Sequence, residues 1–442
     1  MPTLVLSGGR IIDPASGRDS PGDLVIDGAR IVSVADAGAA DAASHRIDCS
    51  GFLVVPGLVD PHVHLREPPF ADRGDPAAFA ALPETIGTGA AAAVAGGFTA
   101  VCAMPNTDPP IDTGEAVAWY MARGRDAGLA RVLVAGCLTR GRAGREVADL
   151  EAMRDAGAVA FTDDGSDVAD DAVFEAALVE AARLAMPVLC HCEDAHLAAG
   201  GVLHAGPLAT MLGLPGIPRE AEEVAVDRAC TAADRTGCRV HIMHVSTEEA
   251  VRRVRRAKAE GVPVTAEATP HHLALIADDL ASRNTVFKVN PPLRTGHDAE
   301  AVLEAVRDGT IDCLATDHAP HTAAAKGRRL AEAPPGMIGL ESALGIYVDT
   351  FIHTPLLEWP ALIGRLTVGP ALALGLPKPS LAAGAPADLT VIDPAAVWTV
   401  DPDQFASRGR NCPFAGRQVY GRVVRTVVGG QVVYEAGGGR DV

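Results

Sequence analysis

The hydrophobic positions follow three different patterns along the chain. Residues 1–56 contain short apolar runs separated by glycine-rich turns, and this pattern predicts β-strands. From residue 57 onward, short apolar runs alternate with alanine-rich or amphipathic stretches of helical spacing. From about residue 380 the short alternating runs return. The sequence therefore predicts a strand–helix repeat framed by two strand-rich ends.

The middle part contains eight strand–helix units. Their apolar runs are GLVDPHVHL, FTAVCAMPN, ARVLVAGCLT, AVAFTDDG, PVLCHCED, RVHIMHVS, PVTAEATPHH and IDCLATDHAP. Several helical stretches end at a glycine, such as Gly128 and Gly261, as helix C-termini often do. Eight such units predict an α/β fold, a (β/α)₈ TIM barrel over residues 57–370, with catalytic residues at the C-terminal strand ends. Residues 1–56 and 371–442 are expected to form a small β-sandwich domain together.

Composition and charge narrow the class of partner. The chain has 442 residues, enough for a large barrel and a smaller unit. A formal net charge of −18 without a dominant basic patch argues against nucleic acid or an anionic membrane as a partner. No apolar run approaches membrane-spanning length and no signal peptide is evident, so a cytoplasmic location is expected. An anionic small-molecule substrate would need local cations, because the overall field repels it.

Candidate metal ligands stand where five of the apolar runs end. They are His62 and His64, the pair Asp163–Asp164, His191, His244 and Asp317. Imidazole and carboxylate groups are the ligands of hydrolytic zinc sites. A His-x-His pair alone also fits strand packing, since alternate residues of a strand share a face. Five strand ends that each carry a suitable ligand instead indicate a metal site.

The other histidines considered and the cysteines are expected to have packing or supporting roles rather than metal-binding ones. The nine cysteines show no disulfide framework, and reduced thiols fit all of them. Cys190 and Cys192 flank His191, but on a strand they point to the opposite face, so we expect packing thiols. His318 and the pair His271–His272 are expected to support the site or pack around it rather than bind metal.

A series of short motifs, which includes the candidate ligands, extends over nearly the whole chain. They are VDPHVHLRE, GGFTAVCAMPNTDPPIDT, AFTDDG, HCED, HVST, AEATPHHL, FKVNPPLR and ATDHAPH. In this order they closely resemble the bacterial class I dihydroorotases of the amidohydrolase superfamily. The resemblance implies reversible hydrolysis of L-dihydroorotate to N-carbamoyl-L-aspartate in de novo pyrimidine (UMP) biosynthesis, with a metal-activated hydroxide as the nucleophile.

The resemblance also implies roles for individual residues. One metal would be held by His62, His64, Asp164 and Asp317. The second would be held by Asp164, His191 and His244, so that Asp164 bridges two Zn²⁺ ions. Asp317 would also act as the proton shuttle. The implied substrate contacts are His64, Leu65, Arg66, Asn106, Asn290, His321, Pro335 and Gly336.

Three departures from relatives concern the bridge and the mouth of the site. Many relatives bridge their metals with a carboxylated lysine, but none of the four lysines here lies near the fourth strand, which leaves Asp164 as the natural bridge. The segment 68–83 is longer than usual, and because it leaves the first strand at the catalytic face, we expect it to border or partly cover the pocket. Pro335 stands where an aromatic residue normally precedes Gly336.

Two other functions are open at this point. A hydantoinase or allantoinase is one, although the HLRE and NPPLR motifs favour a substrate with a carboxylate. A catalytically silent homologue that serves as a structural partner of aspartate transcarbamoylase is the other, although silent copies lose metal ligands that this chain keeps. A homo-oligomer is expected, and an active subunit could also associate with aspartate transcarbamoylase.

Overall fold

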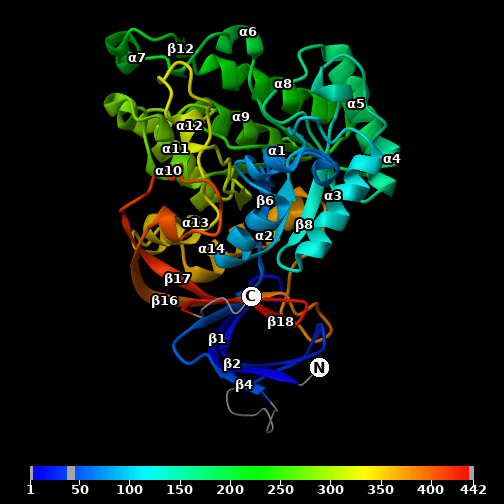
Figure 1. Cartoon of the computed structure of the whole chain (residues 1–442), viewed down its shortest axis with the longest axis vertical. Helices are drawn as coiled ribbons and strands as arrows, with labels where there is room; N and C mark the ends of the chain where they lie inside the picture. Colours follow the sequence, from blue (N-terminus) through cyan, green and yellow to red (C-terminus); the bar gives the residue numbers. More distant parts are fainter. Residues whose placement is uncertain (1–2, 37–44, 438–442) are drawn as a thin grey trace.

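Eight parallel strands form the barrel of the protein, whose computed structural model describes residues 3–36 and 45–437 (Figure 1). In barrel order they are β6 (Leu58–Val63), β7 (Phe98–Ala103), β8 (Arg131–Gly136), β9 (Ala160–Phe161), β10 (Val188–Cys190), β13 (Val240–Ile242), β14 (Val264–Ala268) and β15 (Cys313–Leu314). A bridge between Val63 and His318 brings the first and last strands together, and the His64 N–H donates to the His318 carbonyl at 2.8 Å. The barrel is nearly closed, so the predicted fold is confirmed.

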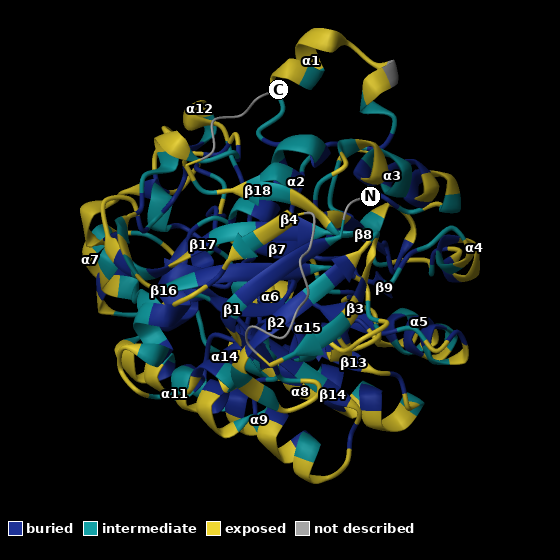
Figure 2. Ribbon diagram, turned by 90° about the horizontal axis from the view of Figure 1, so that it is seen from below, coloured by how far each residue is buried: buried dark blue, intermediate teal, exposed yellow. Residues whose placement is uncertain are grey.

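Helices cover the outside of the barrel, and their outer faces are exposed while the strands are buried (Figure 2). The main ones are α2 (Ile86–Ala95), α3 (Gly114–Ala127), α4 (Leu150–Asp155), α5 (Asp171–Arg183), α8 (Glu220–Thr236), α9 (Glu248–Ala259), α11 (Gly296–Asp308) and α14 (Trp359–Leu366). In α9, Val251 and Val254 are buried whereas Arg252 points outward and pairs with Glu249 at 3.1 Å. The helix ends predicted at Gly128 and Gly261 are confirmed by left-handed φ values of 64° and 83°.

Shorter elements lie in the connections. They are α1 (Pro76–Ala80), α6 (Ala195–Ala198), β11 (Leu203–His204), α7 (Pro207–Leu212), β12 (Gly216–Ile217), α10 (Pro270–Ala274), α12 (Ala323–Lys326), α13 (Ala343–Tyr347) and α15 (Val368–Ala373). Among residues 3–36 and 45–437, no helix is both long enough and apolar enough to cross a membrane.

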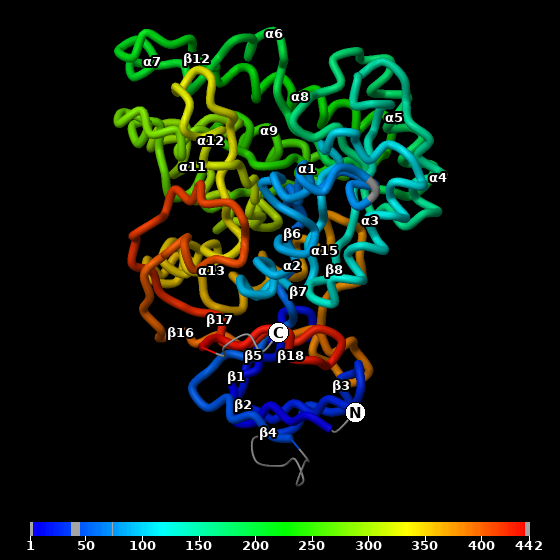
Figure 3. Tube along the Cα trace, in the orientation of Figure 1, coloured from blue at the N-terminus to red at the C-terminus, as the bar shows by residue number. Residues whose placement is uncertain are grey.

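The small domain is one mixed sheet made from both ends of the chain. Its strands are β1 (Leu4–Asp13), β2 (Arg18–Asp27), β3 (Arg30–Ala35), β4 (His45–Asp48), β5 (Leu53–Pro56), β16 (Leu389–Thr399), β17 (Gln418–Val428) and β18 (Gln431–Glu435). The two ends of the chain join where β16 pairs antiparallel with β5. The sandwich prediction is corrected in one respect: hydrogen bonds run through a single continuous sheet, whose parts face each other around a core of their own (Figure 3).

The small sheet leads directly into the barrel strand that carries the His-x-His pair. Only Gly57 separates β5 from β6. A Cβ atom at Gly57 would lie 2.0 Å from the Thr99 Oγ1 atom, so a larger residue cannot fit there without a shift. This close approach fixes β6 against β7 and thereby sets the position of His62.

Candidate active site

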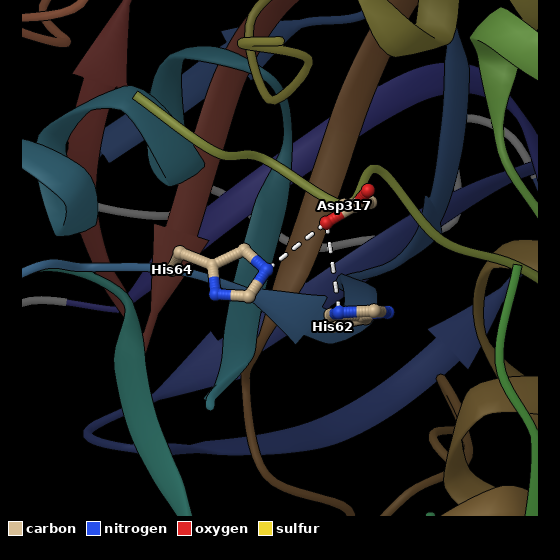
Figure 4. A group of neighbouring side chains, drawn as sticks. All are labelled: His62, His64 and Asp317. Atoms are coloured by element: carbon tan, nitrogen blue, oxygen red, sulfur yellow. Dashed lines mark hydrogen bonds and ion pairs between the residues drawn. The ribbon is translucent and has the colours of Figure 1, made fainter. Parts of the chain in front are cut away.

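The C-terminal ends of the barrel strands bring the six predicted metal ligands together. His62 lies near the end of β6, and the others follow the last residues of their strands, at His64, Asp164, His191, His244 and Asp317. Figure 4 shows His62 and His64 turned toward Asp317, whose Oδ1 atom is 3.5 Å from His62 Nε2 and 3.0 Å from His64 Nε2. All six side chains are buried.

Asp164 lies between the two predicted groups of ligands. Its Oδ1 atom is 3.6 Å from both His62 Nε2 and His191 Nδ1, and its Oδ2 atom is 3.6 Å from His64 Nε2. His191 Nδ1 and His244 Nε2 are 2.9 Å apart. Asp164 therefore contacts both groups, as a bridging ligand must, while the assignment of each ligand to one metal stays a prediction.

The chemistry of these donors fits a divalent metal. Burial and the neighbouring His191 and His62 lower the pKa of His244 well below its usual range, so this imidazole is neutral. Burial alone would raise the pKa of Asp164, but the surrounding histidines, His64 foremost, lower it well below its usual range. The buried His62 Nε2 atom has no hydrogen-bond partner among the described residues. A neutral imidazole, an ionised carboxylate and an unpartnered nitrogen are suitable ligands for such a cation.

A cavity of about 220 Å³ opens onto these ligands. It is lined by His64, Arg66, Asn106, Asp164, Gly165, His191, His244, Val289, Asn290, Asp317, Ala319, His321, Pro334, Pro335 and Gly336. All predicted substrate contacts line it except Leu65, whose buried side chain packs in the core against Gly89 of α2. Drug-sized ligands occupy cavities of about 300–1,000 Å³, so this one suits a smaller molecule. A larger cavity, of about 670 Å³ beside α13, contains none of the predicted site residues.

Arg66 places a permanent positive charge at the wall of the cavity. Its Nε atom donates to the Pro320 carbonyl at 3.3 Å, and its Nη2 atom lies 3.5 Å from His321 Nε2. Burial and the charge of Arg66 lower the pKa of His321 to about 3, so this imidazole is neutral at pH 7. His321 Nε2 donates to the Pro335 carbonyl at 2.8 Å. Pro335 therefore contributes its backbone to this wall.

The two predicted asparagine contacts also touch predicted metal ligands. Asn106 accepts from His64 Nδ1 at 2.9 Å and donates to Asp164 Oδ2 at 2.9 Å, so it braces two ligands that sequence reasoning did not connect to it. Asn290 Nδ2 lies 3.4 Å from His191 Nε2. The Asn290 Oδ1 atom has no hydrogen-bond partner within the described part of the chain, which leaves it available to a substrate donor.

Three of the four lysines are engaged by backbone carbonyls or by a carboxylate. Lys326 donates to the Pro334 carbonyl at 3.1 Å, and Lys288 donates to the Leu330 carbonyl at 2.8 Å, so both anchor the loop before Pro335. Lys258 pairs with Asp312 at 2.5 Å, and Lys378 is exposed. None of the four lines the cavity.

The loop that carries Asp164 is held through Asp163, the other member of the predicted pair, by Leu138, Thr139 and Arg142, which the sequence did not single out. The Asp163 carboxylate accepts from the backbone N–H groups of Leu138 and Thr139 at 2.9 and 3.0 Å. Arg142 donates to the Asp164 carbonyl. These bonds join the loops after β8 and β9 and fix the backbone of the predicted bridge.

The structural roles expected for the cysteines and for His318 agree with their surroundings. Cys190 and Cys192 pack in the main core, and His318 bonds to Glu84 at 3.2 Å, away from the cavity. The His271 Nε2 atom lies 4.0 Å from Asp317 Oδ2 and has no hydrogen-bond partner in residues 3–36 and 45–437. His271 therefore borders a predicted ligand, as a residue that supports the site would.

The long segment 68–83 lies outside the cavity. Its helix α1 is largely exposed and projects from the body of the molecule (Figure 2). Trp119 on α3 donates to Asp72 at 3.1 Å, and Arg408 donates to the Leu82 carbonyl at 3.2 Å. None of the described side chains of this segment lines the cavity, so the expected cover over the pocket is not seen.

Comparisons with known proteins agree with this geometry. The family model described as Dihydro-orotase-like matches residues 51–250. Curated proteins named dihydroorotase from Anaeromyxobacter sp. (strain K) and Pelotomaculum thermopropionicum are 46% and 47% identical to this chain over 98% of each sequence. The solved structure of an L-hydantoinase (dihydropyrimidinase) from Arthrobacter aurescens has a TM-score of 0.85 at 27% identity and covers 99% of this chain and 97% of its own. The chain belongs to the dihydroorotase family of metal-dependent cyclic amidohydrolases.

Proposed function

We propose that the protein hydrolyses L-dihydroorotate reversibly to N-carbamoyl-L-aspartate, a step of de novo pyrimidine biosynthesis. The observation that carries this proposal is the cavity itself, which Arg66 lines together with five of the six predicted metal ligands, all except His62. Ligands alone fit any cyclic amidohydrolase. The Arg66 guanidinium favours a substrate with a carboxylate, because the two groups can form a charge-assisted hydrogen bond. The net charge of −18 otherwise repels an anionic substrate.

In this reaction the oxygen of a water molecule bonds to the ring carbonyl carbon, and the bond from that carbon to the ring nitrogen breaks. Asp317 accepts the proton of the attacking water and delivers it to the leaving nitrogen. Arg66 binds the substrate carboxylate, while the Asn290 Oδ1 atom accepts from the ring. His321 is neutral and held by the Pro335 carbonyl, so it adds a polar contact without a second charge.

We propose two Zn²⁺ ions as the cofactors. His62, His64, Asp164 and Asp317 would hold one, and Asp164, His191 and His244 the other. Bound there, the metal would lower the pKa of a water molecule and polarise the substrate carbonyl. The contacts of Asp164 with His62, His64 and His191 at 3.6 Å support its role as the bridge.

The Arg66→Met variant tests the substrate class. A charge-assisted hydrogen bond contributes about 1.5–3 kcal/mol, which corresponds to a loss of about tenfold to a hundredfold in kcat/KM. We expect a loss of at least this size on dihydroorotate, measured by ultraviolet assay, while neutral dihydrouracil stays as poor a substrate as before. Arg131→Met is a matched control, because Arg131 pairs with Asp388 at 2.8 Å and does not line the cavity.

If Arg66→Met discriminates between the two substrates as strongly as the parent does, Arg66 does not bind the carboxylate.

The second candidate function, a hydantoinase-type activity, is favoured by the structural similarity to the L-hydantoinase. Assays of the parent protein on hydantoin and dihydroorotate under the same conditions compare the two functions directly.

We further propose that the protein forms a homo-oligomer. Met211 on α7 and Leu197 on α6 are 69% and 44% exposed, and Met211 is the position at which we test this contact. We expect light scattering to give a mass that is a multiple of the chain mass, and Met211→Glu to lower it. A monomer at micromolar concentration contradicts the proposal. Co-elution with aspartate transcarbamoylase tests the proposed hetero-assembly separately.

A further inference from the structure

Glu267 places a buried carboxylate against two of the predicted metal ligands. It lies on β14, and its side chain has no exposed surface. Its Oε1 atom accepts from His62 Nδ1 at 2.7 Å and from the backbone N–H of His244 at 3.2 Å. One carboxylate therefore connects a ligand on β6 with a ligand that follows β13.

The contact with His62 decides which ring nitrogen faces the site. An ionised carboxylate only accepts hydrogen bonds, so His62 Nδ1 must carry the hydrogen. In a neutral ring, Nε2 then keeps its lone pair, and this is the atom that lies 3.5 Å from Asp317 and 3.6 Å from Asp164. A carboxylate bonded to a ligating histidine in this way fixes the orientation of the ring and strengthens it as a ligand.

The hydrogen bond between Glu267 and the His244 N–H group holds the backbone conformation at His244. His244 has a φ of 33°, in the left-handed region that residues other than glycine rarely adopt. The hydrogen bond from its N–H group to Glu267 holds this turn, which begins directly after β13. Withdrawal of the Oε1 atom would therefore release both His62 and His244.

The second carboxylate oxygen of Glu267 is fixed from the other side. His241 Nε2 donates to Oε2 at 3.0 Å, and His241 Nδ1 accepts from the Thr265 hydroxyl at 2.8 Å. Cys313 lies close enough to complete a group of three metal-ligand residues, but burial raises the pKa of its thiol well above the usual range. Because Oε2 is already bonded to His241 and Oε1 to His62, these contacts anchor the Glu267 carboxylate from both sides.

We propose that Glu267 is a positioning residue of the metal centre, which sets the tautomer of His62 and holds the backbone turn at His244. The proposal rests on the metal ligation given under the proposed function. Glu267 does not line the cavity, so it acts through the two histidines and does not touch the substrate.

Two variants separate the effect of the length of the Glu267 side chain from the effect of its charge. Glu267→Asp keeps the charge but withdraws the carboxylate by one methylene, whereas Glu267→Gln keeps the reach and an acceptor oxygen. Zinc affinity is measured by competition with a chelator, and ligand geometry by the visible spectrum of the Co²⁺-substituted protein, both without substrate. We expect Glu267→Asp to bind zinc about 10–100-fold more weakly, with an altered cobalt spectrum, and Glu267→Gln to lose less.

Glu222→Asp is the matched control for these measurements. Glu222 is 3% exposed and bonds to Ser246 and Arg294, but it contacts none of the predicted ligands. Parent-like zinc affinity and cobalt spectra in both Glu267 variants overturn the proposal, as does an equal loss of affinity in Glu222→Asp. At saturating zinc, we expect kcat of Glu267→Asp to return toward the parent value with an unchanged KM. A parent protein that binds metal but does not hydrolyse dihydroorotate overturns the proposed function alone.

Discussion

Replacement of Asp317 by asparagine is expected to lower kcat for dihydroorotate hydrolysis by about 10²–10⁴, the range of general acid–base assistance. The change keeps the size of the side chain and one oxygen that can bind metal, but it removes the basic group. Asp317 lines the cavity and lies 3.0 Å from His64, so its carboxylate stands beside both the ligands and the substrate space. Turnover is measured by ultraviolet assay at saturating substrate, with metal content determined on the same sample.

The metal content separates the two roles of Asp317. Asp312→Asn serves as a control in the same stretch of chain, because Asp312 pairs with Lys258 outside the cavity and its replacement should leave kcat near the parent value. If Asp317→Asn turns over at nearly the parent rate with full metal content, another residue carries the proton. His271 is then the next residue to test, because its Nε2 atom is unpartnered within the described residues and lies 4.0 Å from Asp317.

Removal of the metal with a chelator is expected to abolish activity, and zinc in bicarbonate-free buffer is expected to restore it completely. A carboxylated lysine requires carbon dioxide to form, but none of the four lysines lines the cavity, and Asp164 lies 3.6 Å from a histidine of each predicted ligand group. The rate of dihydroorotate hydrolysis and the zinc content are followed during reconstitution, with and without added bicarbonate.

A clear requirement for bicarbonate would show that the assignment of Asp164 as the bridge is wrong. Asp164→Ala provides the comparison, because a chain without its bridge should recover neither zinc content nor activity in either buffer. Recovery of full activity by Asp164→Ala would likewise exclude the bridging role.

The sequence predicted the barrel and the meeting of the candidate ligands at one of its faces, because both depend on local pattern. Each barrel strand lies inside a predicted apolar run, and each ligand stands at the end of such a run. Since parallel strands in a barrel end at the same face, order along the chain was enough to place His62, His191 and Asp317 together.

Contacts between distant strands could not be predicted in this way. His62 and Glu267 come from β6 and β14, and nothing near either residue reveals that their side chains meet at 2.7 Å. The bracing of His64 and Asp164 by Asn106 depends on the same barrel closure. Such contacts depend on strand register and side-chain direction, which hydrophobic periodicity does not specify.

The course of segment 68–83 could not be predicted from the point at which it leaves the first barrel strand. It leaves the barrel at the catalytic face as expected, but the bonds of Asp72 to Trp119 and of Leu82 to Arg408 anchor its two ends outside the cavity, while α1 between them projects from the molecule. The continuous small sheet is a similar case, because alternation predicts strands without their pairing partners.

The pairing of β5 with β16 has a consequence for the chain while the ribosome synthesises it. Residue 56 leaves the ribosome long before its partner, residue 389, has been made. At typical synthesis rates of about 5–20 residues per second, the interval is about 20–70 s. During this time β5 presents an unpaired edge, joined through Gly57 to the strand that carries His62. Such an edge is open to wrong pairing, so the nascent chain must pass through a period of exposure to aggregation that ends only when its last strands emerge.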